Sequence, residues 1–501
     1  MPKRRSTISI PSLKAIDPAG HVGRQLAQGL RDAVSRGELK PGDRLPSTRT
    51  LARSLGLARG TVVEAFEQLI AEGYLEAKVG AGTRVIPALK DEARTAPALP
   101  VARRKVADNP MPAAAGRLSA IARTLTPQPS RPFAVAVPAS GIAPDDTWRR
   151  LGNRVRASGR AAPSSYADPY GVAELRSAIA DHVRRARAVD CTPDNVIVTS
   201  GTQQGLYMAG RVLLSRGDKV WIEDPAYPGL TAVLDDLGMD LHRLPVDGQG
   251  LCVDRGVTGC PEASAVFVTP SHQYPLGMPL SMARRRALVA WAERSNGWIV
   301  EDDYDSELRY AGHPFPAMQG LSPSRVVYLG TFSKVLFPSL RLGYVIAPSR
   351  LVDAFAGAKA ILDRHSPTAD QHVLAAYMRE GYLEAHVRRI RGLYAERRAV
   401  LLAALRTTLP DGCTIQPSDQ GMHILIWLPN TANDVMIAAR ALSAGLAVRP
   451  ISPMYGKPPG RPALMLGFGG FSDDQLVSAT ATFARLLRTA LAARSPRRRA
   501  R

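Results

Sequence analysis

The residues most suited to chemistry lie around Lys334, which follows Thr331-Phe332-Ser333 and precedes Arg341 by seven residues. About thirty residues upstream stands Glu301-Asp302-Asp303-Tyr304. A lysine amine can form a Schiff base, a carboxylate can keep a ring nitrogen protonated, and an arginine can bind a phosphate. One cofactor that uses all three groups is pyridoxal 5′-phosphate. The spacing therefore predicts a site for it, with Lys334 as the reactive amine.

The acidic segment offers more than one partner for the cofactor ring. Asp302 follows an apolar run, Trp298 to Val300, and could sit beneath the ring nitrogen. Tyr304 lies two residues on, on the same face of an extended segment, and could bond the phenolic oxygen of the cofactor. Glu301 or Asp303 could replace Asp302, because the register is open by one residue.

Two further segments could hold other parts of the cofactor. Thr199–Leu206 is a turn of small residues between an expected strand and an expected helix. Backbone N–H groups at such a helix start favour an anion. Tyr227 lies in the proline-containing loop Glu223–Pro228, where its ring could rest on the pyridine face.

These segments need a scaffold that brings strand ends together. From about residue 133 to 491, helical stretches alternate with short β-rich runs, which is typical of an α/β domain with a mostly parallel sheet. Each expected strand ends at a polar turn, where open α/β sheets place their sites. The expected strands are Val196–Val198, Lys219–Ile222, Ala265–Val268, Trp298–Val300 and Val326–Leu329.

The N-terminal part, residues 15–87, has a different pattern. Gln25–Arg36 has helical spacing, Ser47 is a good N-cap for a second helix, and Gly56 makes a tight turn before a third helix from Arg59. Tyr74–Val85 reads as a β-hairpin. Two short helices joined at a glycine form a helix-turn-helix, and the hairpin is its wing, so we expect double-stranded DNA as a partner.

Composition and charge limit the remaining possibilities. The 501-residue chain carries a formal net charge of +21 and four cysteines without metal-ligand spacing. We expect a cytoplasmic protein without a metal site, because scattered cysteines fit a reducing compartment and no apolar run suggests a membrane helix or signal peptide. Residues 88–132, rich in Ala, Pro and Arg, are expected to be a flexible linker, and residues 492–501 a basic tail.

The N-terminal pattern closely resembles the winged-helix domain of GntR-type bacterial regulators. The resemblance rests on Leu45-Pro46-Ser47-x-Arg49-x-Leu51-Ala52, on Leu55-Gly56-x-x-Arg59-x-Thr61-Val62 and on the wing Gly80-x-Gly82-Thr83. Val63 stands where many relatives have another arginine. The resemblance implies that Arg49 and Arg59 touch DNA, that Gly82 lets the wing approach the backbone, and that the DNA-binding set comprises Arg44, Ser47, Arg49, Arg59, Thr61 and Gly82.

The larger region resembles fold-type I aminotransferases over roughly 350 residues. The motifs follow the family order, from Tyr166-x-x-x-x-Gly171 through Ser200-Gly201-Thr202-Gln203 to Ser333-Lys334 and Arg341. The resemblance implies Lys334 as the Schiff-base lysine and Tyr166 reaching the phosphate in the partner subunit of a homodimer. It implies Asp302, Tyr304 and Tyr227 around the ring, and Gly201, Thr202, Gln203, Thr331 and Arg341 around the phosphate.

Two departures weaken the interpretation as an enzyme. Tyr274 replaces the asparagine usual before the Pro-x-Gly element, and Met465 replaces the arginine that clamps the substrate carboxylate. Arg461 is close but unaligned. The cofactor site therefore looks complete, whereas the carboxylate clamp looks degraded.

The order of the two domains resembles the MocR subfamily of GntR-type regulators. The resemblance implies a transcriptional regulator that senses pyridoxal phosphate or its aldimine with an amine or amino acid. The alternatives are an active aminotransferase with a DNA-binding module, which the intact Lys334 favours, and a regulator whose large domain only dimerises. Vitamin B6 synthesis and amine or amino-acid use are both open as targets, and the degraded clamp leans towards the first.

Overall fold

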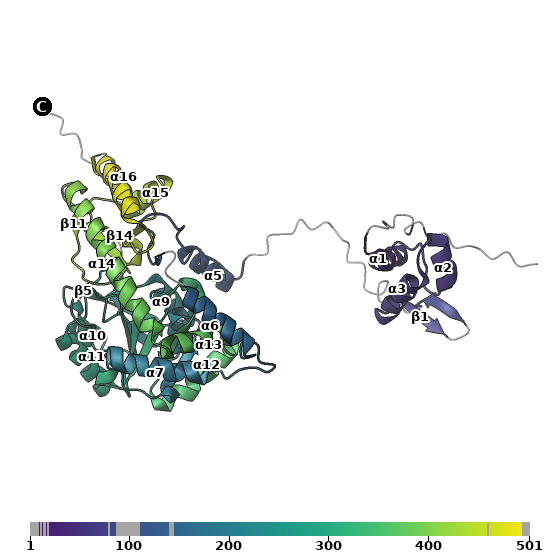
Figure 1. Cartoon of the computed structure of the whole chain (residues 1–501), viewed down its shortest axis with the longest axis horizontal. Coiled ribbons are helices and arrows are strands. Elements are labelled where there is room, and N and C mark those ends of the chain that lie inside the picture. Colours follow the sequence, from purple (N-terminus) through teal and green to yellow (C-terminus); the bar gives the residue numbers. More distant parts are fainter. Residues whose placement is uncertain are drawn as a thin grey trace, which may run out of the picture. The chain divides into compact units, whose positions relative to one another are not determined.

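The chain forms two compact units that divide between Met111 and Pro112 (Figure 1). The computed structural model describes residues 10, 13, 17, 20–78, 81–86, 111–139, 145–457 and 460–492. Gly80 of the expected wing, Pro87 at the end of the expected N-terminal domain, residues 88–110 of the expected linker and the basic tail beyond residue 492 lie outside the described residues.

The N-terminal unit is a winged helix-turn-helix, as predicted. Ser47 caps the second helix by accepting a hydrogen bond from the Thr50 backbone N–H, and Gly56 ends that helix in the left-handed conformation at φ 66°. Leu26, Leu51 and Phe66 meet in its core. Its elements are α1 (Val22–Ser35), α2 (Thr48–Leu55), α3 (Arg59–Ala71) and the antiparallel pair β1 (Leu75–Lys78) and β2 (Gly82–Val85).

The second unit is built on an eight-stranded mixed sheet in the order β3-β10-β9-β8-β7-β4-β5-β6. Pairing is parallel from β9 through β5, whereas β10 is antiparallel to both β3 and β9. The strands are β3 (Val196–Thr199), β4 (Lys219–Asp224), β5 (Asp240–Asp247), β6 (Gly250–Leu251), β7 (Ala265–Val268), β8 (Trp298–Asp303), β9 (Val326–Thr331) and β10 (Gly343–Ile346). The fold class is confirmed, although β5, β6 and β10 were not among the expected strands.

Helices cover both faces of this sheet, and β9 shows the alternation that this requires. Val327 and Leu329 pack with residues of α8 on one face, whereas Val326 and Tyr328 enter clusters on the other. The helices are α5 (Ala113–Thr124), α6 (Asp146–Ala157), α7 (Ala173–Arg187), α8 (Thr202–Leu213), α9 (Pro228–Leu237), α10 (Val253–Gly259), α11 (Met282–Ser295), α12 (Val352–Asp363), α13 (Thr368–Arg379), α14 (Tyr382–Thr408), α15 (Asp434–Ser443) and α16 (Asp473–Ala492).

A smaller sheet forms near the C-terminal end, with the order β11-β12-β14-β13 (Figure 1). Its strands are β11 (Thr414–Ile415), β12 (His423–Trp427), β13 (Arg449–Pro450) and β14 (Ala463–Gly467), and all pairs are antiparallel. Helices α14, α15 and α16 accompany it. Sequence patterning did not separate this sheet from the larger one.

The expected linker, residues 88–132, overlaps the start of the second unit, so its predicted C-terminal boundary was wrong. Helix α5 lies within that range, and residues from Pro112 belong to the second unit. The Gln128 amide donates to the backbone oxygens of Ala447 and Val448, and Arg131 donates to that of Leu442. An Ala-rich segment can be helical despite flanking prolines, and these long-range bonds fix the residues that follow it.

None of the helices in the described residues combines the length and apolar character needed to cross a membrane.

Candidate functional site

A cavity in the second unit collects side chains from both of its sheets. Five of the residues expected around a cofactor line it, namely Thr202, Tyr227, Asp302, Tyr304 and Lys334. The remaining lining residues, which were not expected, are Val135, Ala136, Thr269, Tyr274, Asp305, Met422, His423 and Arg449. Several follow the carboxyl ends of parallel strands, where open α/β sheets place ligands.

Lys334 lies in the turn after β9, between buried neighbours Ser333 and Val335. Burial lowers the pKa of its amine, and the carboxylates of Asp305 and Asp302 oppose this effect without cancelling it. A lysine with a lowered pKa is more often neutral, and a neutral amine is the nucleophile that a Schiff base requires.

The three adjacent acidic residues have distinct environments. Asp302 faces the cavity, and its Oδ1 is buried without a hydrogen-bond partner in the described part of the chain. Asp303 instead forms a buried ion pair with Arg187 at 2.8 Å and accepts a hydrogen bond from the Tyr328 hydroxyl. Glu301 accepts a hydrogen bond from the Gln319 backbone N–H. Its other oxygen is also buried without a partner among the described residues, but Glu301 does not line the cavity. The geometry favours Asp302 as the residue beneath a cofactor ring.

Burial raises the pKa of Asp302 to about 7, and the neighbouring charge of Asp303 adds to the increase. A protonated ring nitrogen is the kind of donor that would satisfy the unpartnered oxygen and stabilise the carboxylate. The donor set of this cavity therefore fits pyridoxal phosphate.

The expected phosphate residues divide into two groups. Gly201 precedes α8 at φ 93°, and a Cβ there would come within 3.3 Å of the Arg341 guanidinium. Arg341 itself donates to the Ser200 backbone oxygen at 2.6 Å. Gly201, Thr202 and Arg341 thus form a cradle at a helix start, which favours an anion.

Gln203 and Thr331 lie close to this cradle but have other hydrogen-bond partners. The Gln203 amide donates to the Gly229 backbone oxygen and accepts from the Tyr227 hydroxyl at 3.3 Å. Thr331 is buried at the end of β9 and donates to the Ser333 hydroxyl at 3.0 Å. Both contacts support the neighbouring loops. Of the five expected phosphate residues, Thr202 lines the cavity and the other four do not.

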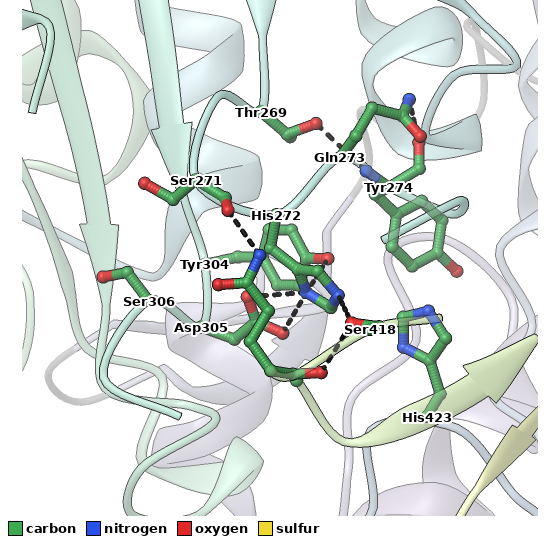
Figure 2. Close-up of polar contacts among 12 residues, drawn as sticks. Thr269, Ser271, His272, Gln273, Tyr274, Tyr304, Asp305, Ser306, Ser418 and His423 are labelled. Carbon is green, nitrogen blue, oxygen red and sulfur yellow. Dashed lines mark hydrogen bonds and ion pairs between the residues drawn. The ribbon is translucent and has the colours of Figure 1, made fainter. Parts of the chain in front are cut away.

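Tyr304 comes close to a histidine and an aspartate that the sequence motifs contained but did not single out. Its hydroxyl lies 2.9 Å from His272 Nδ1, which also lies 2.9 Å from Asp305 Oδ2 (Figure 2). His272 and Asp305 have side-chain exposures of 1% and 4%. The phenol expected at the cofactor oxygen therefore adjoins a buried histidine–aspartate pair.

The structure adds a cationic residue that the sequence motifs did not single out. Met465 is buried in β14, but its cross-strand partner is Arg449 of β13, and Arg449 lines the cavity. Arg461 instead lies over the Trp427 ring at 4.3 Å. The cationic residue is thus supplied by the neighbouring strand, a displacement that only strand pairing reveals.

Tyr166 does not line the cavity of its own chain. Its side chain is 79% exposed and lies against His365 and Arg364, with its ring 6.2 Å from the His365 ring. This position is compatible with the expected role towards a second subunit.

In the N-terminal unit, Arg49 on α2 and Arg59 at the start of α3 are exposed, and Thr61 is half-buried. Exposed arginines near the N-terminal ends of the two helices of a helix-turn-helix are suited to contact base edges or phosphates. Arg44 packs against Gly82, where an added Cβ would lie 2.9 Å from its Nε. Gly82 thus leaves room for Arg44, whereas the Ser47 oxygen caps α2.

The comparisons with known proteins follow the same division. The family described as bacterial regulatory proteins of the gntR family matches residues 23–85, and aminotransferase class I and II matches residues 141–463. The chain is 38% identical to the probable rhizopine catabolism regulatory protein MocR of Rhizobium meliloti, covering 90% of this chain and 91% of that protein.

A second relative and a solved structure extend the comparison. The pyridoxine biosynthesis transcriptional regulator PdxR of Corynebacterium glutamicum is 34% identical, over 90% of this chain and 93% of its own length. The α-aminoadipate aminotransferase LysN of Thermus thermophilus, solved with N-(5′-phosphopyridoxyl)-L-leucine, superposes with a TM-score of 0.70 at 26% identity. It covers 76% of this chain and 97% of its own.

Proposed function

This chain belongs to the MocR subfamily of GntR-type transcriptional regulators, and from that premise we propose that pyridoxal phosphate and an amino-acid effector control its binding to operator DNA. The observation that carries the proposal is the cavity in which Lys334, with its lowered pKa, accompanies the unpartnered carboxylate oxygen of Asp302. A domain that only dimerised would have no use for that pair.

Each part of the cofactor has a matching group. Pyridoxal phosphate, when bound, supplies an aldehyde that condenses with an amine and a ring that withdraws electrons. Lys334 would provide the amine, Asp302 would hold the proton on the ring nitrogen, and Tyr227 would flank the ring. Gly201, Thr202 and Arg341 would bind the phosphate, with Gln203 and Thr331 supporting the loops and Tyr166 contributed by the partner in a homodimer.

Arg449 supports an effector that carries a carboxylate. A guanidinium in a partly enclosed cavity favours a carboxylate, because charge-assisted hydrogen bonds are stronger than neutral ones. Val135 and Met422 add apolar surface to the same cavity. We therefore propose an amino acid rather than a simple amine as the effector. The earlier preference for vitamin B6 synthesis as the target loses its basis, because it depended on a missing arginine.

The DNA-binding unit would read the operator through Arg49 and Arg59, with Arg44 on the phosphate backbone. A homodimer would present two such units to two half-sites. The names of the relatives include both pyridoxine biosynthesis and rhizopine catabolism, so genes of B6 or of amine metabolism are suitable targets to test.

Transaminase activity is the second candidate function, and a specific observation favours it: Lys334 and Arg449 line one cavity, and a guanidinium there could bind a substrate carboxylate. An enzyme would turn over an amino acid with a keto acid, whereas a sensor would only bind it.

Absorbance spectra of the purified protein with added pyridoxal phosphate, beside Lys334→Ala, test the cofactor. We expect a band at about 420 nm that requires Lys334. No lysine-dependent band would refute the cofactor proposal. Operator binding with and without cofactor and amino acids, beside an assay for keto-acid formation, then separates the two functions: changed DNA affinity without turnover supports the sensor, and turnover without changed DNA affinity supports the enzyme.

A further inference from the structure

His272, Tyr304 and Asp305 form a polar cluster beside the cavity (Figure 2). Cofactor binding as proposed requires neither His272 nor Asp305. His272 Nδ1 lies 2.9 and 3.1 Å from the two oxygens of Asp305 and 2.9 Å from the Tyr304 hydroxyl. One ring nitrogen therefore faces an acidic residue and a phenol at the same time.

The Asp305 carboxylate determines where the protons of the His272 ring and the Tyr304 hydroxyl lie. Burial raises the pKa of Asp305, and the contact with His272 opposes this. In its ionised form the carboxylate can only accept, so the nitrogen that faces it then carries a proton. That N–H is then shared with the Tyr304 oxygen, which acts as a second acceptor. The hydroxyl proton of Tyr304 is not used by the imidazole and is free to be donated elsewhere. Tyr304 lines the cavity together with Lys334, so a ligand in the cavity can receive that proton.

The surroundings hold the imidazole in place. Gly421 adopts φ 79°, and a Cβ there would lie 2.1 Å from His272 Cε1. On the far side of the ring, Nε2 lies 3.5 Å from the Ser418 hydroxyl, which donates to the Gln420 backbone oxygen. A buried polar pair is often no more stabilising than apolar packing, so stability alone gives little reason for this arrangement.

We propose that His272, oriented by Asp305, is a positioning residue for the Tyr304 phenol and directs its proton at the ring oxygen of the bound cofactor. This inference rests on the proposed function. It also accounts for Tyr274: in aminotransferases an asparagine amide stands before the Pro-x-Gly element, and here the tyrosine has no such amide, whereas His272, two residues earlier, provides an N–H donor to the phenol.

Other ionisable groups surround the cluster and bear on its pH dependence. His423 stacks obliquely on His272 at 5.4 Å, and burial lowers its pKa to about 3, so it is neutral above pH 5. The charge of Lys334 acts on Asp305, and the charge of Arg449 acts on His423. A pH titration that tests the cluster must therefore compare variants in which Lys334, Arg449 and His423 are unchanged.

The test is a double-mutant cycle on the pH midpoint of the visible band of cofactor-loaded protein. A hydrogen bond from the Tyr304 hydroxyl to the ionised ring oxygen favours the deprotonated chromophore. Loss of that hydrogen bond therefore raises the pH midpoint. We expect Tyr304→Phe and His272→Leu each to raise it by about one pH unit, roughly the effect of one hydrogen bond to a charged group. The double variant should raise the midpoint no further than Tyr304→Phe alone does, because both substitutions remove the same interaction.

Conservative variants separate positioning from packing. His272→Asn places an amide N–H where Nδ1–H lies and should keep the midpoint of the parent protein. His242→Leu, on β5 outside the cavity lining, is the matched control and should change nothing. If His272→Leu does not fold, His272→Phe and His272→Phe/Tyr304→Phe complete the same cycle, because phenylalanine keeps a ring and lacks the N–H.

Three outcomes overturn the inference. An unchanged midpoint in His272→Leu, or effects that add to those of Tyr304→Phe, would show that the histidine does not act through the phenol. A parent protein without a Lys334-dependent band would refute the proposed function and this inference with it. Cofactor affinity, measured by the same band, should fall together in the Tyr304→Phe and His272→Leu variants.

Discussion

The unpartnered carboxylate of Asp302 predicts an unusual mutational effect: Asp302→Asn should stabilise the cofactor-free protein at pH 8. The pKa of Asp302 is raised from 3.8 to about 7, mainly by burial. The folded state therefore holds the proton more tightly than the unfolded chain, so stability falls as pH rises from about 4 to about 7 and the penalty is complete above that. The neutral amide removes this penalty.

The magnitude follows from the pKa change. A carboxyl whose pKa is raised from 3.8 to about 7 costs roughly 4 kcal/mol at pH 8. The side chain of Asp302 is only half-buried, because it faces the cavity. Solvent in the cavity screens the carboxylate and reduces the energetic cost to about 2 kcal/mol. At pH 4 both proteins carry a nearly neutral group, and their stabilities should agree within about 0.5 kcal/mol.

Urea unfolding followed by tryptophan fluorescence measures this difference. All five tryptophans, Trp148, Trp221, Trp291, Trp298 and Trp427, lie in the second unit, so the signal reports that unit alone. The matched control is Asp303→Asn, which breaks the buried pair with Arg187 and should destabilise by about 3 kcal/mol. A loss of stability in Asp302→Asn at pH 8 would refute the reasoning, because it would show that the carboxylate has a stabilising partner.

Three shorter predictions concern other residues. Arg449→Leu should weaken binding of amino acids by about tenfold or more and leave amines without a carboxylate unaffected, measured as the spectral change of the cofactor-loaded protein. Gly201→Ala should lower cofactor affinity by about tenfold, because φ 93° strains alanine and the Cβ approaches Arg341 at 3.3 Å; equilibrium titration checks this. Ser47→Ala should destabilise α2 by about 1 kcal/mol, seen as faster amide hydrogen exchange in the full-length protein.

The parts of the fold that sequence predicted well are those in which local chemistry determines structure. Ser47 and Gly56 bound α2 because capping and a left-handed turn are properties of single residues. The strands before Asp302 and Lys334 were recognisable because buried parallel strands are continuous apolar runs. Asp302 lies at the end of β8 and Lys334 lies just after the end of β9, so the parallel pairing of these strands brings both residues to one edge of the sheet.

The parts that sequence did not predict depend on contacts between distant segments. Arg449 is found only by knowing that β13 pairs with β14, because the residue aligned with the usual clamp is Met465. The pairing of His272 with Asp305 joins residues 33 positions apart, and each alone is an ordinary polar residue. Helix α5 was hidden by a composition shared with the linker before it.

The cost of Asp302 bears on how a regulator could use this fold. A cofactor that neutralises a buried charge stabilises the folded state by RT ln(1 + [L]/Kd), in addition to its own contacts. Without it, Asp302 opposes the packing of the same cavity that Lys334 and Arg449 line. Under the proposed function, the folding equilibrium of the second unit would therefore depend in part on the cofactor concentration, because a ligand shifts an equilibrium only through a difference in free energy between states. For an enzyme this dependence would be a defect to be overcome by tight binding, whereas for a sensor it is the signal. Asp302→Asn should accordingly give a protein whose stability no longer responds strongly to cofactor and whose DNA affinity is the same with and without it.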